Sequence, residues 1–172
     1  LFRSRVAPWQ YAATSQLNTS EYQGSDRFGS ALVASETGQF MYAGAPGNQT
    51  GRVASFVKQS NGDWLENAFL ASDHSSTLNY GNALALSPLS LVVAADKSNN
   101  STGQLFVYRE RQTTVSQVIA GPEAASRFGA AMCTSKNGQW LYVSATGINR
   151  VFAYTWESKV ARAQQALAGS PR

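Results

Sequence analysis

The sequence has little of the chemistry that most catalytic sites need, with one cysteine, one histidine and few charged residues among 172. Cys133 alone excludes an internal disulfide and a cysteine-cluster zinc site, and its small apolar neighbours predict a buried position. His74 lies beside Asp73 and Ser75, but adjacent residues cannot reach the geometry of a Ser-His-Asp site. Carboxylates do not pair closely within any predicted strand. The sequence therefore predicts no catalytic residue and no cofactor, and a protein that is not an enzyme.

Charge is scarce too, since Asp, Glu, Lys and Arg make up 14% of the chain, against about 25% in typical globular proteins. The net charge of +4 comes from scattered basic residues, whereas a nucleic-acid interface needs a basic stripe. Apolar runs such as Leu89–Ala95 are too short to span a membrane. Aromatic residues reach 11%, which argues against disorder. We therefore expect an ordered chain with no nucleic-acid partner and no direct membrane insertion.

The sequence does contain an internal repeat. An aromatic-glycine pair occurs three times, about 50 residues apart, as Phe28-Gly29, Tyr80-Gly81 and Phe128-Gly129. An apolar strand follows each pair, at residues 40–46, 91–96 and 140–145. A further strand then begins at Gly51, Gly103 and Asn149. Turn sequences containing Gly38 and Gly138 join the first two strands of the outer repeats, and the middle repeat has Ser87–Ser90 there instead.

Repeats of this length with four short strands are typical of propeller blades. The predicted fold is all-β, a β-propeller segment of about three four-stranded antiparallel blades plus part of a preceding blade. We expect blades at residues 20–72, 73–122 and 123–172, after the end of an earlier blade at 1–19, with each second strand the most buried. A closed propeller needs about 4–8 blades, so further blades from the same or another chain are expected partners. Expressed alone, residues 1–172 should associate.

The segment Trp156–Leu167 leaves two alternatives open. Trp156, Val160, Ala163 and Leu167 have the spacing of one face of a helix. The repeat instead places the last strand of the third blade in this segment.

Phe28-Gly29 followed by Ala43-Gly44-Ala45-Pro46 resembles the FG-GAP repeat, which builds the β-propeller of integrin α-chains. The resemblance covers nearly the whole chain and is strongest in the first repeat, since Ala94–Asp96 and Ser144–Thr146 replace Gly-Ala-Pro in the others. It implies a non-enzymatic extracellular or cell-surface module that mediates adhesion-like protein or glycan interaction. The alternatives are a structural building block of an extracellular assembly and an accessory propeller of a larger enzyme.

Calcium-binding members of this family carry several aspartates in the loop between the first and second strands. The corresponding loops here are Ser35–Gly38, Ser87–Ser90 and Ser135–Gly138. They contain one glutamate, no acid and a lysine, respectively, whereas calcium needs several oxygen ligands around one centre. We therefore predict no metal in these loops.

Modification sites are the remaining candidates. The sequence Asn-x-Ser/Thr, which accepts N-linked glycans in secreted proteins, occurs at Asn18, Asn48, Asn99 and Asn100. In a four-stranded blade, all four positions map to loops on one face. This placement suits an extracellular glycoprotein.

The loop sequences generate a first prediction about metal. Treatment with EDTA should leave the thermal midpoint of unfolding unchanged, because the three loops lack the oxygen ligands that calcium requires. Differential scanning calorimetry with and without added calcium measures this. A midpoint several degrees lower in EDTA than in calcium would contradict the prediction.

Overall fold

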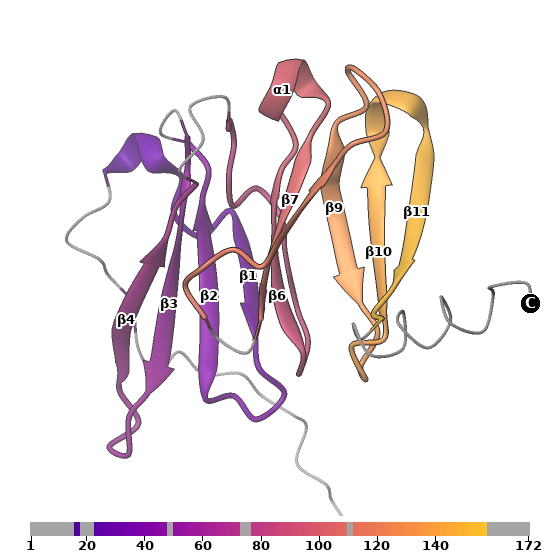
Figure 1. The fold of residues 1–172 in the computed structure, drawn as a ribbon. Helices are drawn as coiled ribbons and strands as arrows, with labels where there is room; N and C mark the ends of the chain where they lie inside the picture. The colour runs from indigo at the N-terminus through magenta and orange to yellow at the C-terminus, as the bar shows by residue number, and fades with distance from the viewer. Residues whose placement is uncertain (1–15, 18–22, 48–49, 73–76, 110–111, 158–172) are drawn as a thin grey trace, which may run out of the picture.

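A computed structural model describes residues 16–17, 23–47, 50–72, 77–109 and 112–157. Their strands form three antiparallel sheets that stand side by side (Figure 1). Strand β5 lies against β1 of the first sheet and β9 of the third, so the first strands of the sheets are neighbours. The all-β, propeller-type fold predicted from the repeat is confirmed. Among the described residues, no helix is long and apolar enough to cross a membrane.

The first blade contains four strands joined in sequence order. They are β1 (Ala31–Ala34), β2 (Phe40–Ala45), β3 (Arg52–Lys58) and β4 (Trp64–Leu70), preceded by the short 3-10 helix η1 (Gly24–Asp26). The turn between β3 and β4 closes with a hydrogen bond from Gln59 N to Asp63 O of 2.7 Å, as the sequence Asn61-Gly62 favours. Residues 1–15 and 18–22, where the end of a preceding blade is expected, lie outside the described residues.

The second blade repeats this topology with β5 (Leu84–Leu86), β6 (Ser90–Ala95), β7 (Gln104–Arg109) and β8 (Gln117–Ala120). The whole of β6 is buried, as its unbroken apolar run predicts. The segment α1 (Ser98–Ser101) between β6 and β7 is a turn rather than a regular helix, because Asn99 and Asn100 have left-handed backbone angles.

The third blade shows three strands within the described residues, namely β9 (Phe128–Thr134), β10 (Trp140–Ala145) and β11 (Arg150–Thr155), with the 3-10 helix η2 (Thr146–Ile148) between the last two. The expected fourth strand, or helix, falls mostly in residues 158–172, outside the described part. Two expectations are wrong here. Cys133 is exposed, and β10 is only partly buried, because no blade within the described residues covers the outer face of this sheet.

Two apolar clusters hold the blades together. The first joins Tyr42, Val53 and Leu70 of the first blade to residues of the second, including Leu91 and Phe106. The second cluster joins the second and third blades in the same way. Side chains alternate along each strand, so one face of a sheet contacts the preceding blade and the other face contacts the next.

The aromatic-glycine pair makes the closest contact between blades. Tyr80, fully buried, donates its backbone N–H to Thr50 O at 2.9 Å, and Phe128 makes the equivalent bond to Thr102 O at 3.1 Å. A glycine follows each acceptor. A Cβ added at Gly51 would lie 2.2 Å from Tyr80 O, and one at Gly103 would lie 2.2 Å from Phe128 O. Glycine is therefore required at both junctions, for space as well as for a positive φ.

This close contact generates a prediction about stability. Gly51→Ala and Gly103→Ala should each reduce the free energy of unfolding by more than Gly62→Ala, which has a φ of +91° but no atom within 4 Å of an added Cβ. The control loses about 1–2 kcal/mol from left-handed strain. Overpacking at a junction adds at least about 1 kcal/mol. Urea denaturation measures the difference, and equal losses for all three variants would contradict it.

Candidate functional site

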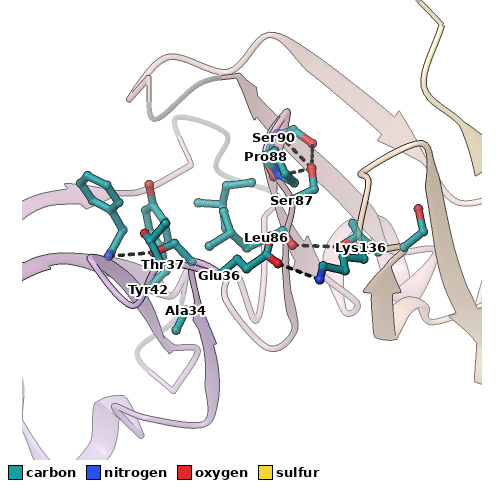
Figure 2. Close-up of a pocket in the computed structure, with 14 residues that line it drawn as sticks. Ala34, Glu36, Thr37, Tyr42, Leu86, Ser87, Pro88, Ser90 and Lys136 are labelled. Atoms are coloured by element: carbon teal, nitrogen blue, oxygen red, sulfur yellow. Dashed lines mark hydrogen bonds and ion pairs between the residues drawn. The ribbon is translucent and has the colours of Figure 1, made fainter.

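The first hairpins of all three blades meet at one cleft of about 770 Å³. The first two blades contribute the end of the first strand, the turn and the start of the second strand, and the third blade contributes the end of its first strand and the beginning of its turn (Figure 2). The residues that line the cleft include Glu36, Tyr42, Leu86, Leu91, Thr134 and Lys136. A volume of roughly 300–1,000 Å³ is typical of small-molecule sites, so the cleft is the candidate functional site.

A serine at the same position of each hairpin fixes the turn. Ser35 Oγ accepts hydrogen bonds from the backbone N–H of Gln39 and Phe40, at 3.1 and 3.0 Å. Ser135 Oγ accepts from Trp140 N at 3.0 Å, and Ser87 Oγ accepts from Ser90 N at 3.1 Å. These hydroxyls are engaged with their own hairpins, so their main role is to hold the wall of the cleft.

The residue after each serine differs between the blades, as Glu36, Pro88 and Lys136. Lys136 Nζ lies 2.9 Å from Glu36 Oε1, and the pair connects the first blade to the third across the cleft (Figure 2). The side chains are 85% and 65% exposed, respectively. An exposed ion pair contributes little to stability, so a ligand can replace either partner at small cost.

The wall of the cleft combines apolar and polar groups. Tyr42 and Leu91 are buried side chains at the base of the cleft, and both belong to the cluster that joins the first two blades. Thr134 Oγ1 donates a hydrogen bond of 2.8 Å to Leu86 O and so joins the third blade to the second. The cleft therefore has a fixed apolar base and a charged rim.

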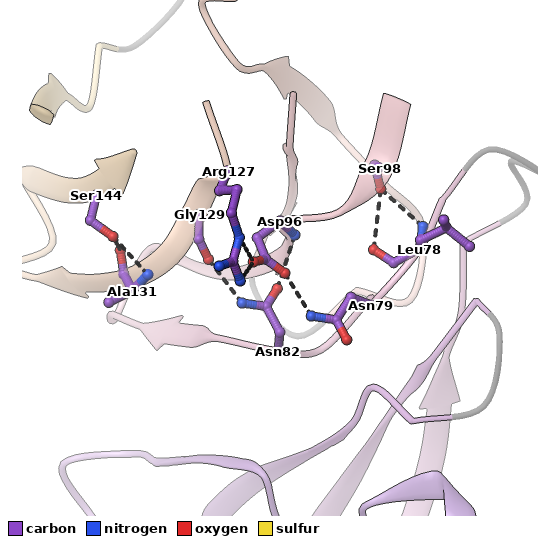
Figure 3. A network of polar contacts seen from close by, with 9 residues as sticks. All are labelled: Leu78, Asn79, Asn82, Asp96, Ser98, Arg127, Gly129, Ala131 and Ser144. Carbon is purple, nitrogen blue, oxygen red and sulfur yellow. Dashed lines mark hydrogen bonds and ion pairs between the residues drawn. The ribbon is translucent and has the colours of Figure 1, made fainter. Parts of the chain in front are cut away.

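A polar network joins the second and third blades at the opposite end of the sheets (Figure 3). Asp96 is buried and accepts hydrogen bonds from Asn79 Nδ2 at 2.6 Å and from Arg127 Nη2 at 2.7 Å. Asn82 donates from Nδ2 to Gly129 O at 3.1 Å, also between the blades. These hydrogen bonds satisfy the buried carboxylate, so we assign this network to the junction and not to a binding site.

A second groove of about 500 Å³ lies between the second and third blades. The Arg109 guanidinium lies over the Trp156 ring, 5.4 Å from its centroid. Burial raises the pKa of Tyr154, which also lines this groove. The groove is bounded by two blades only, whereas all three contribute to the cleft.

Two of the four predicted glycosylation sites fall within the described residues and lie away from the cleft. Asn99 and Asn100 are exposed in the turn between β6 and β7, at the same end as the Asp96 network. Asn18 and Asn48 fall outside the described residues, as does His74. Glycosylation at all four asparagines stays a prediction. Among the described residues, no group of three or more His, Cys, Asp or Glu side chains could hold a metal ion.

The cleft residues were not found from the sequence. Ser35 and Ser135 begin the same pattern, Ser-x-x-Gly-Gln-aromatic, with a glutamate in one copy and a lysine in the other. The opposite charges of Glu36 and Lys136, at the same position of two repeats, were the signal in the sequence that could have indicated this site. Their meeting depends on the angle between the blades, which the sequence does not give.

Comparisons with known proteins show the fold but not the family. No family model matches the chain, and no curated protein matches it. A solved structure from Bacteroides uniformis, of a protein provisionally named 6-phosphogluconolactonase, matches with a TM-score of 0.55 and 16% sequence identity. The match covers 76% of this chain and 40% of that protein, so the chain spans less than half the length of this structural neighbour.

This likeness contradicts the expected function. We expected an adhesion-like module that contacts proteins or glycans, but the matching fold belongs to a protein that is named as a 6-phosphogluconolactonase and not as an adhesion protein. The repeat specifies how blades pack, and the same packing supports unrelated functions. The resemblance to the FG-GAP repeat therefore does not indicate adhesion. That this chain belongs to the FG-GAP family stays a proposal.

The exposed ion pair generates a prediction about stability. Glu36→Gln, Lys136→Gln and the double variant should each change the free energy of unfolding by less than about 1 kcal/mol, because both side chains are largely solvated. A double-mutant cycle by urea denaturation gives the coupling energy of the pair. A coupling energy of several kcal/mol would show instead that the pair holds the blades together.

Proposed function

We propose that this chain is the small-molecule-binding part of a β-propeller and that the ligand occupies the cleft formed by the three first hairpins. The observation that carries the proposal is the meeting of Glu36 and Lys136, from equivalent positions of two blades, at a cleft of about 770 Å³. Equivalent turns hold the same backbone shape and differ in the side chains that they present. This is how a repeated scaffold builds an asymmetric site.

The charges favour a ligand that carries both hydroxyl groups and an anionic group. An ammonium such as Lys136 binds phosphate or carboxylate, and a carboxylate such as Glu36 accepts hydrogen bonds from hydroxyls. The apolar base at Tyr42 and Leu91 suits the C–H face of a sugar. A sugar acid or sugar phosphate has all three features. The name of the structural neighbour, 6-phosphogluconolactonase, refers to this class of compound and agrees with the proposal.

We propose that the described residues bind this ligand without converting it. Among the lining residues, Glu36 is the one carboxylate and histidine is absent. The serines of the hairpins accept hydrogen bonds from the backbone. Among the described residues, no hydrogen bond joins these hydroxyls to Glu36 or Lys136, as activation of a serine nucleophile by a general base requires. Adding the protein to 6-phosphogluconolactone should therefore leave its rate of hydrolysis unchanged.

Calorimetric titration tests the proposal with four probes: 6-phosphogluconate, gluconate, glucose and inorganic phosphate. We expect binding of the first two and weaker binding of the last two, because glucose lacks the anionic group and inorganic phosphate lacks both the sugar hydroxyls and the C–H face. Lys136→Glu should weaken binding by about tenfold or more, the loss expected for a hydrogen bond to a charged group.

Lys97→Glu makes the same change of charge on the loop at the opposite end of the sheets, outside the cleft, and serves as the matched control. It should leave the dissociation constants unchanged. Absence of binding for every probe at millimolar concentration would contradict the proposal, as would equal losses in the two charge-reversal variants.

A further inference from the structure

The groove between the second and third blades is far larger than the corresponding space between the first two. Its volume is about 500 Å³, whereas the cavity at the first junction has about 40 Å³. Both spaces are lined by the second, third and fourth strands of the earlier blade at matching positions. Gln112 and Thr113, from the loop after β7, also line the first cavity. The corresponding loop of the third blade falls outside the described residues.

Smaller side chains on the wall of the earlier blade contribute to the larger groove. Phe40 and Tyr42 of β2 line the cavity at the first junction. The residues at their positions in β6 are Ser90 and Val92, which line the groove at the second junction. Exchange of two aromatic rings for a hydroxymethyl and an isopropyl group leaves space between the sheets. The size of the groove is therefore set in part by described residues of its own wall.

A tyrosine hydroxyl that has a partner in the second blade lacks one in the third. The hydroxyl groups of Tyr80 and Tyr108 share a hydrogen bond. Their counterparts in the third blade are Phe128 and Tyr154, so the partner hydroxyl is missing. No residue of the described part of the chain forms a hydrogen bond with the Tyr154 hydroxyl. Burial raises the pKa of Tyr154, so this hydroxyl keeps its proton at neutral pH and can donate it to a ligand.

A guanidinium group with unused donors lines the same groove. Arg109 occupies the position of Val57 in the first blade, and its guanidinium carbon lies 5.4 Å from the centroid of the Trp156 ring. Contact with the ring face leaves N–H groups of the guanidinium available for hydrogen bonds. Within the described ranges, this guanidinium has no hydrogen bond or ion pair. The contact with Trp156 therefore positions a cation whose donors are free.

We propose that this groove binds a small amphipathic carboxylate, with the carboxylate at Arg109 and Tyr154 and the apolar body against the floor. Val92, Ile119 and Leu141 form that floor and are buried or partly buried. Arginine can bind a carboxylate through two parallel hydrogen bonds. An apolar lining with a few polar groups is typical of small-molecule sites, as is a volume of roughly 300–1,000 Å³.

The charges on the groove favour an anionic ligand over a cationic one. Among the described lining residues, Arg109 is the one basic residue and Glu157 the one acidic residue. Glu157 is exposed and already has an interaction partner. Arg109 is therefore the charged group that a ligand can engage without displacing another contact of the same kind.

Calorimetric titration tests the proposal with four probes: 3-phenylpropionate, 3-phenylpropanamide, 3-phenylpropylamine and propionate. The first has both recognised features. The amide lacks the charge, the amine reverses it, and propionate lacks the ring. We expect 3-phenylpropionate to bind with a dissociation constant in the millimolar range or below. Each of the others should bind at least about tenfold more weakly, because each lacks the charge-assisted hydrogen bonds or the apolar contact.

Variants of the two donors locate the binding. Arg109→Gln should weaken binding of 3-phenylpropionate by about tenfold or more and leave binding of the amide unchanged, and Tyr154→Phe should weaken the carboxylate by about threefold. Both side chains are exposed or partly exposed, and circular dichroism checks that each variant keeps its fold. Lys58→Gln is the matched control, since Lys58 Nζ lies 6.0 Å from the centroid of the Trp64 ring in the first blade. It should have no effect.

Equal affinity for the carboxylate and the amide would overturn the proposal, as would equal losses in Arg109→Gln and Lys58→Gln. Absence of 3-phenylpropionate binding at millimolar concentration would also overturn it, and is the result expected if residues 158–172 fill the groove. The groove and the cleft are tested separately. Arg109 does not line the cleft, so Arg109→Gln should leave gluconate binding unchanged, and either site can fail without the other.

Discussion

The close approach of the aromatic-glycine pair to the preceding blade is the contact on which the other features depend. At each junction an aromatic residue, Tyr80 or Phe128, places its backbone against a glycine that precedes the third strand of the blade before it. The contact sets the distance between sheets, and buried apolar residues fill the space that results. It also orients the first hairpins, so the shape of the cleft follows from a main-chain contact made elsewhere in the blade.

The ion pairs at the two ends of the sheets differ in their burial. At one end, Asp96 and Arg127 connect two blades through a buried carboxylate with several donors, and removing one partner there leaves a charge without compensation. At the other end, Glu36 and Lys136 meet in solvent, where separation costs little. Because this exposed pair contributes little to stability, the hairpins at the second end are free to differ between the blades.

The correction of the adhesion hypothesis follows from the same physics. The aromatic residues, the glycines and the apolar strands that resemble the FG-GAP repeat are the residues that pack blades together. They therefore report the fold, which a provisionally named lactonase shares at 16% identity. In the function proposed above, ligand choice depends on a few side chains at the hairpin tips that differ between the blades, such as Glu36 and Lys136.

The sequence by itself determined the number of described blades, their order and the position of their turns, because aromatic-glycine spacing and strand hydrophobicity are local properties of the chain. Tertiary structure alone decided which faces are covered and which side chains meet. Cys133 follows small and apolar residues in the sequence, which are typical of buried strands, but its side chain is exposed. Burial depends on a neighbouring blade and not on the strand itself. Glu36 and Lys136 form a pair because the angle between sheets brings distant hairpins together, and that angle is set by packing across junctions, which no local pattern encodes.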